Sequence, residues 1–295
     1  MYDHPINQAN ENNPFGDFTT EEFYKKHKIL HHQSFMLNKK KMKIFTQSWV
    51  LDSTNPKGLV AMIHGYSSES SWVNELTAIA IAKLGFLVFA LDLQGHGRSD
   101  GLPGHIPNIQ YLVNDCIQYF DSVKAEYPKV PAFLYGESLG AKFKPIWPLE
   151  KLLPVAALFA PSWKGVVSKS VGSKSYKEEW KRKLMAKNPN RRPTGKPPAA
   201  TALELLRVCE FIRNHCHELD VPLLIVHGGD DMVCDFDSAR FVYESATSKD
   251  KTLKIFPGMW HVLIGEPKEN VQVVFDTILS WLENHDTRTS HKGSN

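Results

Sequence analysis

One short stretch limits what this chain can fold into: an apolar run followed at once by a glycine-x-serine-x-glycine pentapeptide. Residues 132–135 have the composition of a buried β-strand, and the pentapeptide fills 136–140 with Ser138 at its centre. A serine hydroxyl is a weak nucleophile, and a tight strand-to-helix turn lifts its oxygen clear of the backbone, towards a histidine base. The pentapeptide alone is a weak signal because glycine and serine are common. Its partners must come from elsewhere in the chain.

Strands and helices are predicted to alternate along this 295-residue chain, which favours an α/β fold with mostly parallel strands. The clearest helix is 109–127, because its apolar side chains recur every three or four residues and so line one face. A hairpin is expected at 33–49, and residues 1–28 are polar and predicted to be loosely ordered. The remaining expected strands are 58–63, 87–90, 223–226 and 252–256, and the remaining expected helices are 72–84, 201–213, 238–246 and one marked by apolar residues from 271 to 282.

Composition places the chain among ordinary globular proteins, since 42% of its residues are hydrophobic and 23% are charged. Its four cysteines lack the paired spacing of a zinc site, which predicts free thiols in a reducing compartment. A zinc site is disfavoured because no second ligand group has suitable spacing from Cys209, His215, Cys216 and His217. No apolar stretch near the amino terminus resembles a signal peptide or membrane span, so a cytoplasmic protein is expected.

Positive charge is concentrated in one block, although the net charge is only +3. Residues 164–196 hold basic side chains opposed only by Glu178 and Glu179. Such a block can attend an anionic membrane or nucleic acid. No aromatic stacking platform or groove-reading motif accompanies it, so nucleic-acid binding is not expected. The favoured interpretation is a solvated excursion of the chain, with weak association at anionic membranes as the alternative.

Two later strands feed turns that carry the other groups that a nucleophilic serine needs. Residues 223–226 lead into a turn with Asp231, and residues 252–256 lead into a turn with His261. The histidine would take the serine proton, and the carboxylate would fix the histidine tautomer and stabilise the imidazolium. The order serine, acid, histidine is the order found in α/β-hydrolases. Asp230 and Asp235 compete with Asp231 for the role of the acid.

An oxyanion hole needs two backbone amides, one directly after the nucleophile and one after an earlier strand. Leu139 would supply the first amide. Tyr66 is the candidate for the second, because it follows the strand 58–63 within the run His64-Gly65-Tyr66. His64 itself is interpreted as a residue that braces this loop.

Several runs give the chain a family resemblance that covers most of residues 15–285. It resembles the monoacylglycerol lipase-like α/β-hydrolases, particularly the plant group that includes caffeoylshikimate esterase and lysophospholipase-like proteins. The matching runs are His64-Gly65-Tyr66-Ser67-Ser68-Glu69-Ser70-Ser71-Trp72, the specific stretch Asp92 to Gly101, the pentapeptide, His227 to Asp231 and Gly258 to His261. The resemblance implies a mostly parallel sheet with helices on both faces and an inserted cap. It also implies a triad of Ser138, Asp231 and His261, with Asp231 preferred because the family pattern reads His-Gly-x-x-Asp.

The chain departs from this family directly after the pentapeptide, where a helix and another core strand should precede the cap. Pro145 lies seven residues past Ser138 and Pro148 follows, so a helix there can run for little more than a turn or two. We therefore expect that the post-nucleophile helix and the next strand are missing. The alternative is that residues 155–160 form the missing strand behind a shortened helix, which the length of the connection permits.

The expected organisation is a core in two parts, 29–140 and 201–285, with a cap at 141–200 between them. A polar segment, 1–28, precedes the core, and a disordered tail, 286–295, follows it. Apolar cap residues would bind the acyl group, namely Ile146, Trp147, Leu152 and Leu153. The expected function is hydrolysis of lipid-like esters such as monoacylglycerols, with phenolic esters second, and without a cofactor or metal. An impaired relative that binds a ligand or partner is the competing hypothesis.

Overall fold

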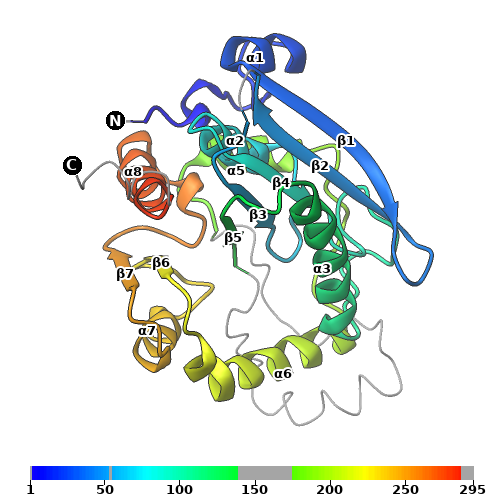
Figure 1. Cartoon of the computed structure of the whole chain (residues 1–295), viewed down its shortest axis with the longest axis vertical. Coiled ribbons are helices and arrows are strands. Elements are labelled where there is room, and N and C mark those ends of the chain that lie inside the picture. Colours follow the sequence, from blue (N-terminus) through cyan, green and yellow to red (C-terminus); the bar gives the residue numbers. More distant parts are fainter. Residues whose placement is uncertain (1, 53–54, 139–174, 287–295) are drawn as a thin grey trace.

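The computed structural model describes residues 2–52, 55–138 and 175–286. Its larger sheet has five strands in the order β1-β2-β4-β3-β5, in which β1 and β2 form an antiparallel hairpin and β4, β3 and β5 run parallel (Figure 1). Strands β6 and β7 form a separate parallel pair. The strand bounds are β1 Ile29–Leu37, β2 Lys43–Leu51, β3 Leu59–Ile63, β4 Leu87–Leu91, β5 Ala132–Gly136, β6 Leu223–Gly228 and β7 Lys251–Phe256.

Helices cover both faces of the larger sheet, because its central strands are apolar on both sides. Val60 and Val88 face a cluster that contains helices α2 and α8, whereas Ala61 and Phe89 face aromatic residues of α3. Side chains alternate between the two faces of a strand, so each helix layer receives every second residue. The helix bounds are α1 Thr20–His27, α2 Val73–Ala82, α3 Ile109–Glu126, α5 Glu179–Ala186, α6 Ala199–His215, α7 Phe236–Ser245 and α8 Lys268–Asn284. None of these described helices is long and apolar enough to cross a lipid bilayer.

The amino-terminal segment is ordered, and the expectation of a loose leader was wrong. A short 3-10 helix, η1 (Pro5–Gln8), precedes α1, and both pack on the core with Ile6 and Phe23 fully buried. Thr19 and Glu22 form a reciprocal capping box that starts α1. The few apolar side chains of this polar stretch therefore attach it to the core, and average composition alone does not predict this packing.

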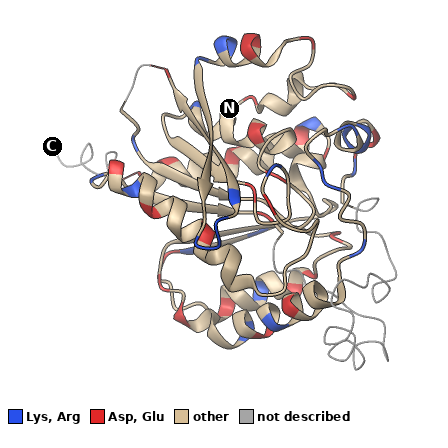
Figure 2. Ribbon diagram, turned by 90° about the vertical axis from the view of Figure 1, so that its right-hand side faces the viewer, with Lys and Arg blue, Asp and Glu red and all other residues tan. Residues whose placement is uncertain are grey.

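The described part of the basic block, residues 175–196, also differs from the expectation of a solvated segment. Lys181 is buried, and its ammonium group donates to the carbonyls of Ile264 and Glu266 at 2.8 and 2.6 Å. Arg192 donates to the Gly97 carbonyl at 2.9 Å. Figure 2 shows basic and acidic residues interspersed over the described ribbon. These cations tie the segment to the core because backbone carbonyls accept their hydrogen bonds.

The described strands leave the sheet in two parts at the position of the expected gap. β5 pairs with β3, and β6 pairs with β7, but β5 and β6 do not pair with each other. The Leu134 side chain of β5 is 68% exposed, which is unusual for a core strand. Residues 139–174 contain both the expected site of the missing elements and the alternative strand at 155–160, so both lie outside the described residues.

Candidate active site

Ser138 lies two residues beyond β5 with a backbone φ of 59°. A positive φ is uncommon for a residue other than glycine, and such strain clusters at functional sites. Gly65 passes close by, since a Cβ atom added there would lie 3.1 Å from the Cβ of Ser138 and 3.2 Å from the Glu137 carbonyl oxygen. The absence of a side chain at Gly65 thus lets the loop after β3 approach the serine.

The side chains of Ser138, His261 and Asp231 form one hydrogen-bonded chain. The distance from Ser138 Oγ to His261 Nε2 is 2.5 Å, and the distance from His261 Nδ1 to Asp231 Oδ2 is 2.8 Å. A carboxylate oxygen accepts, so Nδ1 donates and Nε2 of the neutral ring is left to accept from the serine hydroxyl. The imidazole is therefore placed to remove the proton from Ser138.

Backbone amides hold the Asp231 carboxylate in its orientation. Its Oδ1 accepts from the amides of Val233 and Cys234 at 2.7 and 2.9 Å, which leaves Oδ2 for His261. Burial alone would raise the pKa of Asp231, but the hydrogen bonds from His261 and the two amides outweigh burial and hold that pKa below its usual value. Asp231 is thus kept as an anion beside the imidazole.

The competing carboxylates occupy other places. Asp235 is the N-cap of α7 and accepts from the amide of Asp237 at 3.1 Å. Asp230 is exposed in the turn after β6. Of the three carboxylates, the structure gives Asp231 the hydrogen bond to His261, although its catalytic role stays a prediction.

The loop after β3 is braced beside the serine. His64 is buried, accepts from the Leu93 amide at 3.0 Å and donates from Nδ1 to the Gly65 carbonyl at 2.8 Å. Burial lowers the pKa of His64, which suits the neutral ring that these bonds require. The Tyr66 hydroxyl donates to the Gly104 carbonyl at 3.0 Å. His64 therefore occupies the bracing position expected for it.

The expected oxyanion-hole and acyl-binding residues remain predictions. Tyr66 follows Gly65, so its amide belongs to the loop that approaches Ser138. The other members of the set lie outside the described residues, namely Leu139, Ile146, Trp147, Leu152 and Leu153.

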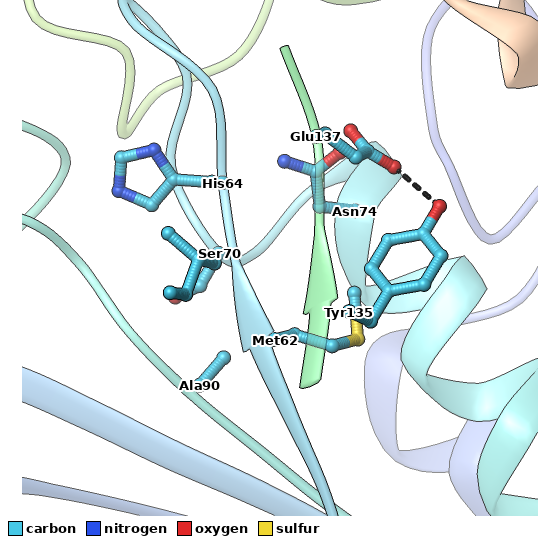
Figure 3. Close-up of a pocket in the computed structure, with 8 residues that line it drawn as sticks. Met62, His64, Ser70, Asn74, Ala90, Tyr135 and Glu137 are labelled. Atoms are coloured by element: carbon cyan, nitrogen blue, oxygen red, sulfur yellow. Dashed lines mark hydrogen bonds between the residues drawn. The ribbon is translucent and has the colours of Figure 1, made fainter. Parts of the chain in front are cut away.

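A small cavity lies next to the turn that carries Ser138, which we call the elbow, and residues of β3 and β5 line it (Figure 3). Its volume is about 10 Å³, room for about one water molecule, so it is not a substrate pocket. Glu137 and Tyr135 line it, and the tyrosine hydroxyl donates to the Glu137 carboxyl at 2.8 Å. Burial raises the pKa of Glu137 above its usual value.

Two groups near the site were missed by sequence reasoning. Asp92 is fully buried and accepts from the Ser70 and Arg98 amides, both at 2.8 Å, so it links two loops behind the serine. The thiol of Cys234 lies 3.3 Å from His261 Nδ1. No local pattern indicated this contact, since Cys234 and His261 are far apart in the chain.

Known proteins resemble this chain in both sequence and fold. Caffeoylshikimate esterase of Arabidopsis thaliana is 32% identical over 303 aligned positions, which cover 92% of this chain and 91% of that protein. Human monoglyceride lipase is 30% identical, with 81% of this chain and 86% of that protein covered. A soluble variant of Saccharomyces cerevisiae monoglyceride lipase, solved with a substrate analogue, superimposes with a TM-score of 0.74 at 18% identity over 86% of this chain and 95% of that one.

A family profile matches the chain in two stretches, residues 54–145 and 141–268, which meet just after the elbow. The profile is that of the Hydrolase_4 family, described as serine aminopeptidase, S33. The two stretches together span more than half of the sequence and contain Ser138, Asp231 and His261. With the α/β architecture and the plant relative at 32% identity, these matches show that the chain belongs to the Hydrolase_4 family of α/β-hydrolases.

Proposed function

We propose that the chain is a serine hydrolase of carboxylic esters, with lipid-like esters such as monoacylglycerols as its first substrate class and phenolic esters as its second. The single observation that carries the proposal is the hydrogen-bonded chain from Ser138 through His261 to Asp231. The names of the relatives, a caffeoylshikimate esterase and monoglyceride lipases, support these two substrate classes.

In the proposed reaction Ser138 Oγ attacks the ester carbonyl while its proton moves to His261 Nε2. The tetrahedral oxyanion would be held by the Tyr66 and Leu139 amides. Collapse releases the alcohol, which takes the proton from Nε2, and leaves the acyl group on Ser138. Water then attacks the acyl-enzyme, gives a proton to Nε2, and the acid is released as the serine recovers its proton. Asp231 keeps the Nδ1 proton throughout and stabilises the imidazolium.

The proposal is tested with a fluorophosphonate probe and three substrates: a monoacylglycerol, a phenolic ester and an aminoacyl anilide. Wild-type protein is expected to be labelled once and to prefer the monoacylglycerol. Ser138→Ala and His261→Ala should each abolish turnover, since loss of either residue costs about 10⁶ in an intact enzyme of this kind. The proposal fails if Ser138→Ala protein is still labelled, or if the anilide is the best substrate.

We also propose that turnover is far below that of an intact relative, because elements after the elbow are missing. The family profile supports this, because it matches in two stretches that meet just after the elbow. The alignment with the plant esterase also runs over 303 positions, more than the 295 residues of this chain. Losing one oxyanion donor typically costs about 10² to 10³ in turnover.

The comparison is made against human monoglyceride lipase in the same assay. Slow labelling and a low soluble yield are expected, since an unpaired strand edge promotes aggregation. A monomer that melts cooperatively and turns over a monoacylglycerol at about 1 to 10³ per second would refute the missing-segment hypothesis. Labelling without turnover would favour the alternative, an impaired relative that binds a ligand or partner.

A further inference from the structure

Three side chains with metal-binding atoms lie close together around Nδ1 of His261. The ligand atoms of Asp231, Cys234 and His261 all lie within 4.8 Å of one another. Cys234 Sγ is 3.3 Å from His261 Nδ1, which in turn is 2.8 Å from Asp231 Oδ2. Zinc bonds of about 2.0 to 2.3 Å in tetrahedral geometry place neighbouring ligands about 3.2 to 3.7 Å apart. The thiol and Nδ1 are already at this separation, but Sγ is also 4.0 Å from Nε2, so the thiol lies over the ring face and has to turn towards the Nδ1 lone pair. The carboxylate oxygen has to withdraw from Nδ1 by at least about 0.4 Å.

We propose that Asp231, Cys234 and His261 form a Zn²⁺ site and that zinc bound there reversibly inhibits the hydrolase. A mixed set of one thiolate, one imidazole and one carboxylate suits zinc, whereas Mg²⁺ prefers oxygen ligands alone. Three protein ligands leave one position of a tetrahedral ion for water or a fourth group.

His227 provides a second observation that favours a cation here. Its Nδ1 lies 2.8 Å from the Gly228 carbonyl oxygen, which can only accept, so Nδ1 donates. That leaves Nε2 for another partner, and it lies 3.5 Å from Asp231 Oδ2. His227 is therefore near enough to become the fourth ligand of a cation beside Oδ2 after a small movement.

Binding would change where the protons of the site reside. Zinc displaces the Cys234 thiol proton to solvent, because the thiolate rather than the thiol is the metal ligand. Zinc also takes the lone pair of His261 Nδ1, so the single proton of the neutral ring has to move to Nε2. That proton then faces Ser138 Oγ, and the ring can no longer accept the serine proton. The bound ion therefore removes the general base without touching the nucleophile.

The inhibitory effect rests on the proposed esterase function, but zinc binding does not. Binding is therefore measured in the full-length Ser138→Ala chain, which keeps all three ligands, by competition with a chromophoric zinc indicator. We expect one Zn²⁺ per chain and a dissociation constant at least about tenfold weaker when Cys234→Ala is added, because even partners outside the ligand shell contribute that much. Cys116→Ala, at a buried cysteine of α3 outside this cluster, is the matched control and should leave affinity unchanged.

A second measurement follows ester hydrolysis by the wild-type chain. Zinc should inhibit, EDTA should restore the rate, and Mg²⁺ at the same concentration should have no effect. Each variant is compared with its own metal-free rate, and Cys234→Ala should need at least about tenfold more zinc for the same fractional inhibition. The proposal is overturned if the Ser138→Ala chain binds no zinc, if Cys234→Ala leaves the affinity unchanged, or if Cys116→Ala weakens binding as much. Thermal melts confirm that the variants are folded.

Discussion

Replacing Asp231 by asparagine tests how the carboxylate is held. In the wild type Oδ1 accepts from the amides of Val233 and Cys234, and Oδ2 accepts from His261 Nδ1. An asparagine has one oxygen. If it faces the two amides, its NH₂ group faces Nδ1, and if it faces Nδ1, its NH₂ group faces two donors.

The first orientation should be favoured, because it preserves both backbone hydrogen bonds. His261 can then be neutral only with its proton on Nε2, so that Nδ1 accepts from the asparagine NH₂ group. This is the wrong tautomer for removing the proton from Ser138, and an equivalent change in a serine protease lowers kcat by about 10⁴. That factor corresponds to about 5 kcal/mol in the activation free energy. Stability should change little, because the packing is nearly isosteric.

The assay is the rate of fluorophosphonate labelling together with turnover of a monoacylglycerol, each relative to wild type. Asp235→Asn is the matched control, since asparagine is also a good N-cap and α7 should be unaffected. A labelling rate within tenfold of wild type for Asp231→Asn would refute the reasoning. So would a loss of similar size in Asp235→Asn, which would move the acid to that residue.

Three further predictions concern the surroundings of the site. Burial raises the pKa of Glu75 to about 8, above its value in the unfolded chain, so the native state should lose roughly 3 kcal/mol of stability as the pH rises from 5 to 8. Glu75→Gln, which can still accept from Tyr24, should make the free energy of unfolding in urea less dependent on pH over this range. An unchanged pH dependence would contradict the assignment. Gly65→Ala should slow labelling of Ser138 at least about tenfold with little change in melting temperature, because the new methyl group crowds the serine. Residues 164–196 should give weak binding to anionic vesicles in flotation that high salt abolishes, and salt-independent binding would exclude an electrostatic origin.

The triad residues could be chosen from the sequence because each follows a strand. Ser138, Asp231 and His261 come after β5, β6 and β7, and parallel strands bring their carboxyl ends to one edge. The apolar runs of these strands and the three-to-four-residue periodicity of α3 are local signals. Local patterns therefore predicted the alternation of elements and the turns that meet, whereas the preference for Asp231 over Asp230 and Asp235 came from the family resemblance.

Contacts between distant residues could not be predicted in the same way. Ile6 fills the core from a stretch whose composition is polar, and Lys181 donates to carbonyls more than eighty positions away. Cys234 reaches His261 across a turn. Each depends on how two loops pack, and no spacing along the chain encodes that packing. The sequence of the basic block suggested solvation because charge count carries no information about which carbonyls are within reach.

The division of the described sheet raises the question of what holds the two halves of the triad together. Ser138 depends on the pairing of β5 with β3, whereas Asp231 and His261 depend on the separate pair β6 and β7. Helix α8 contacts both, because Trp281 lies edge-on to Phe133 of β5 with ring centroids 6.2 Å apart, and the same apolar cluster includes Leu224 of β6. Among the described residues, packing against α8 therefore links the strand that precedes Ser138 to the strand that precedes Asp231. Packing contacts are individually weak and non-directional, so small shifts of α8 would change the distance between Ser138 and His261 before either sheet unfolds.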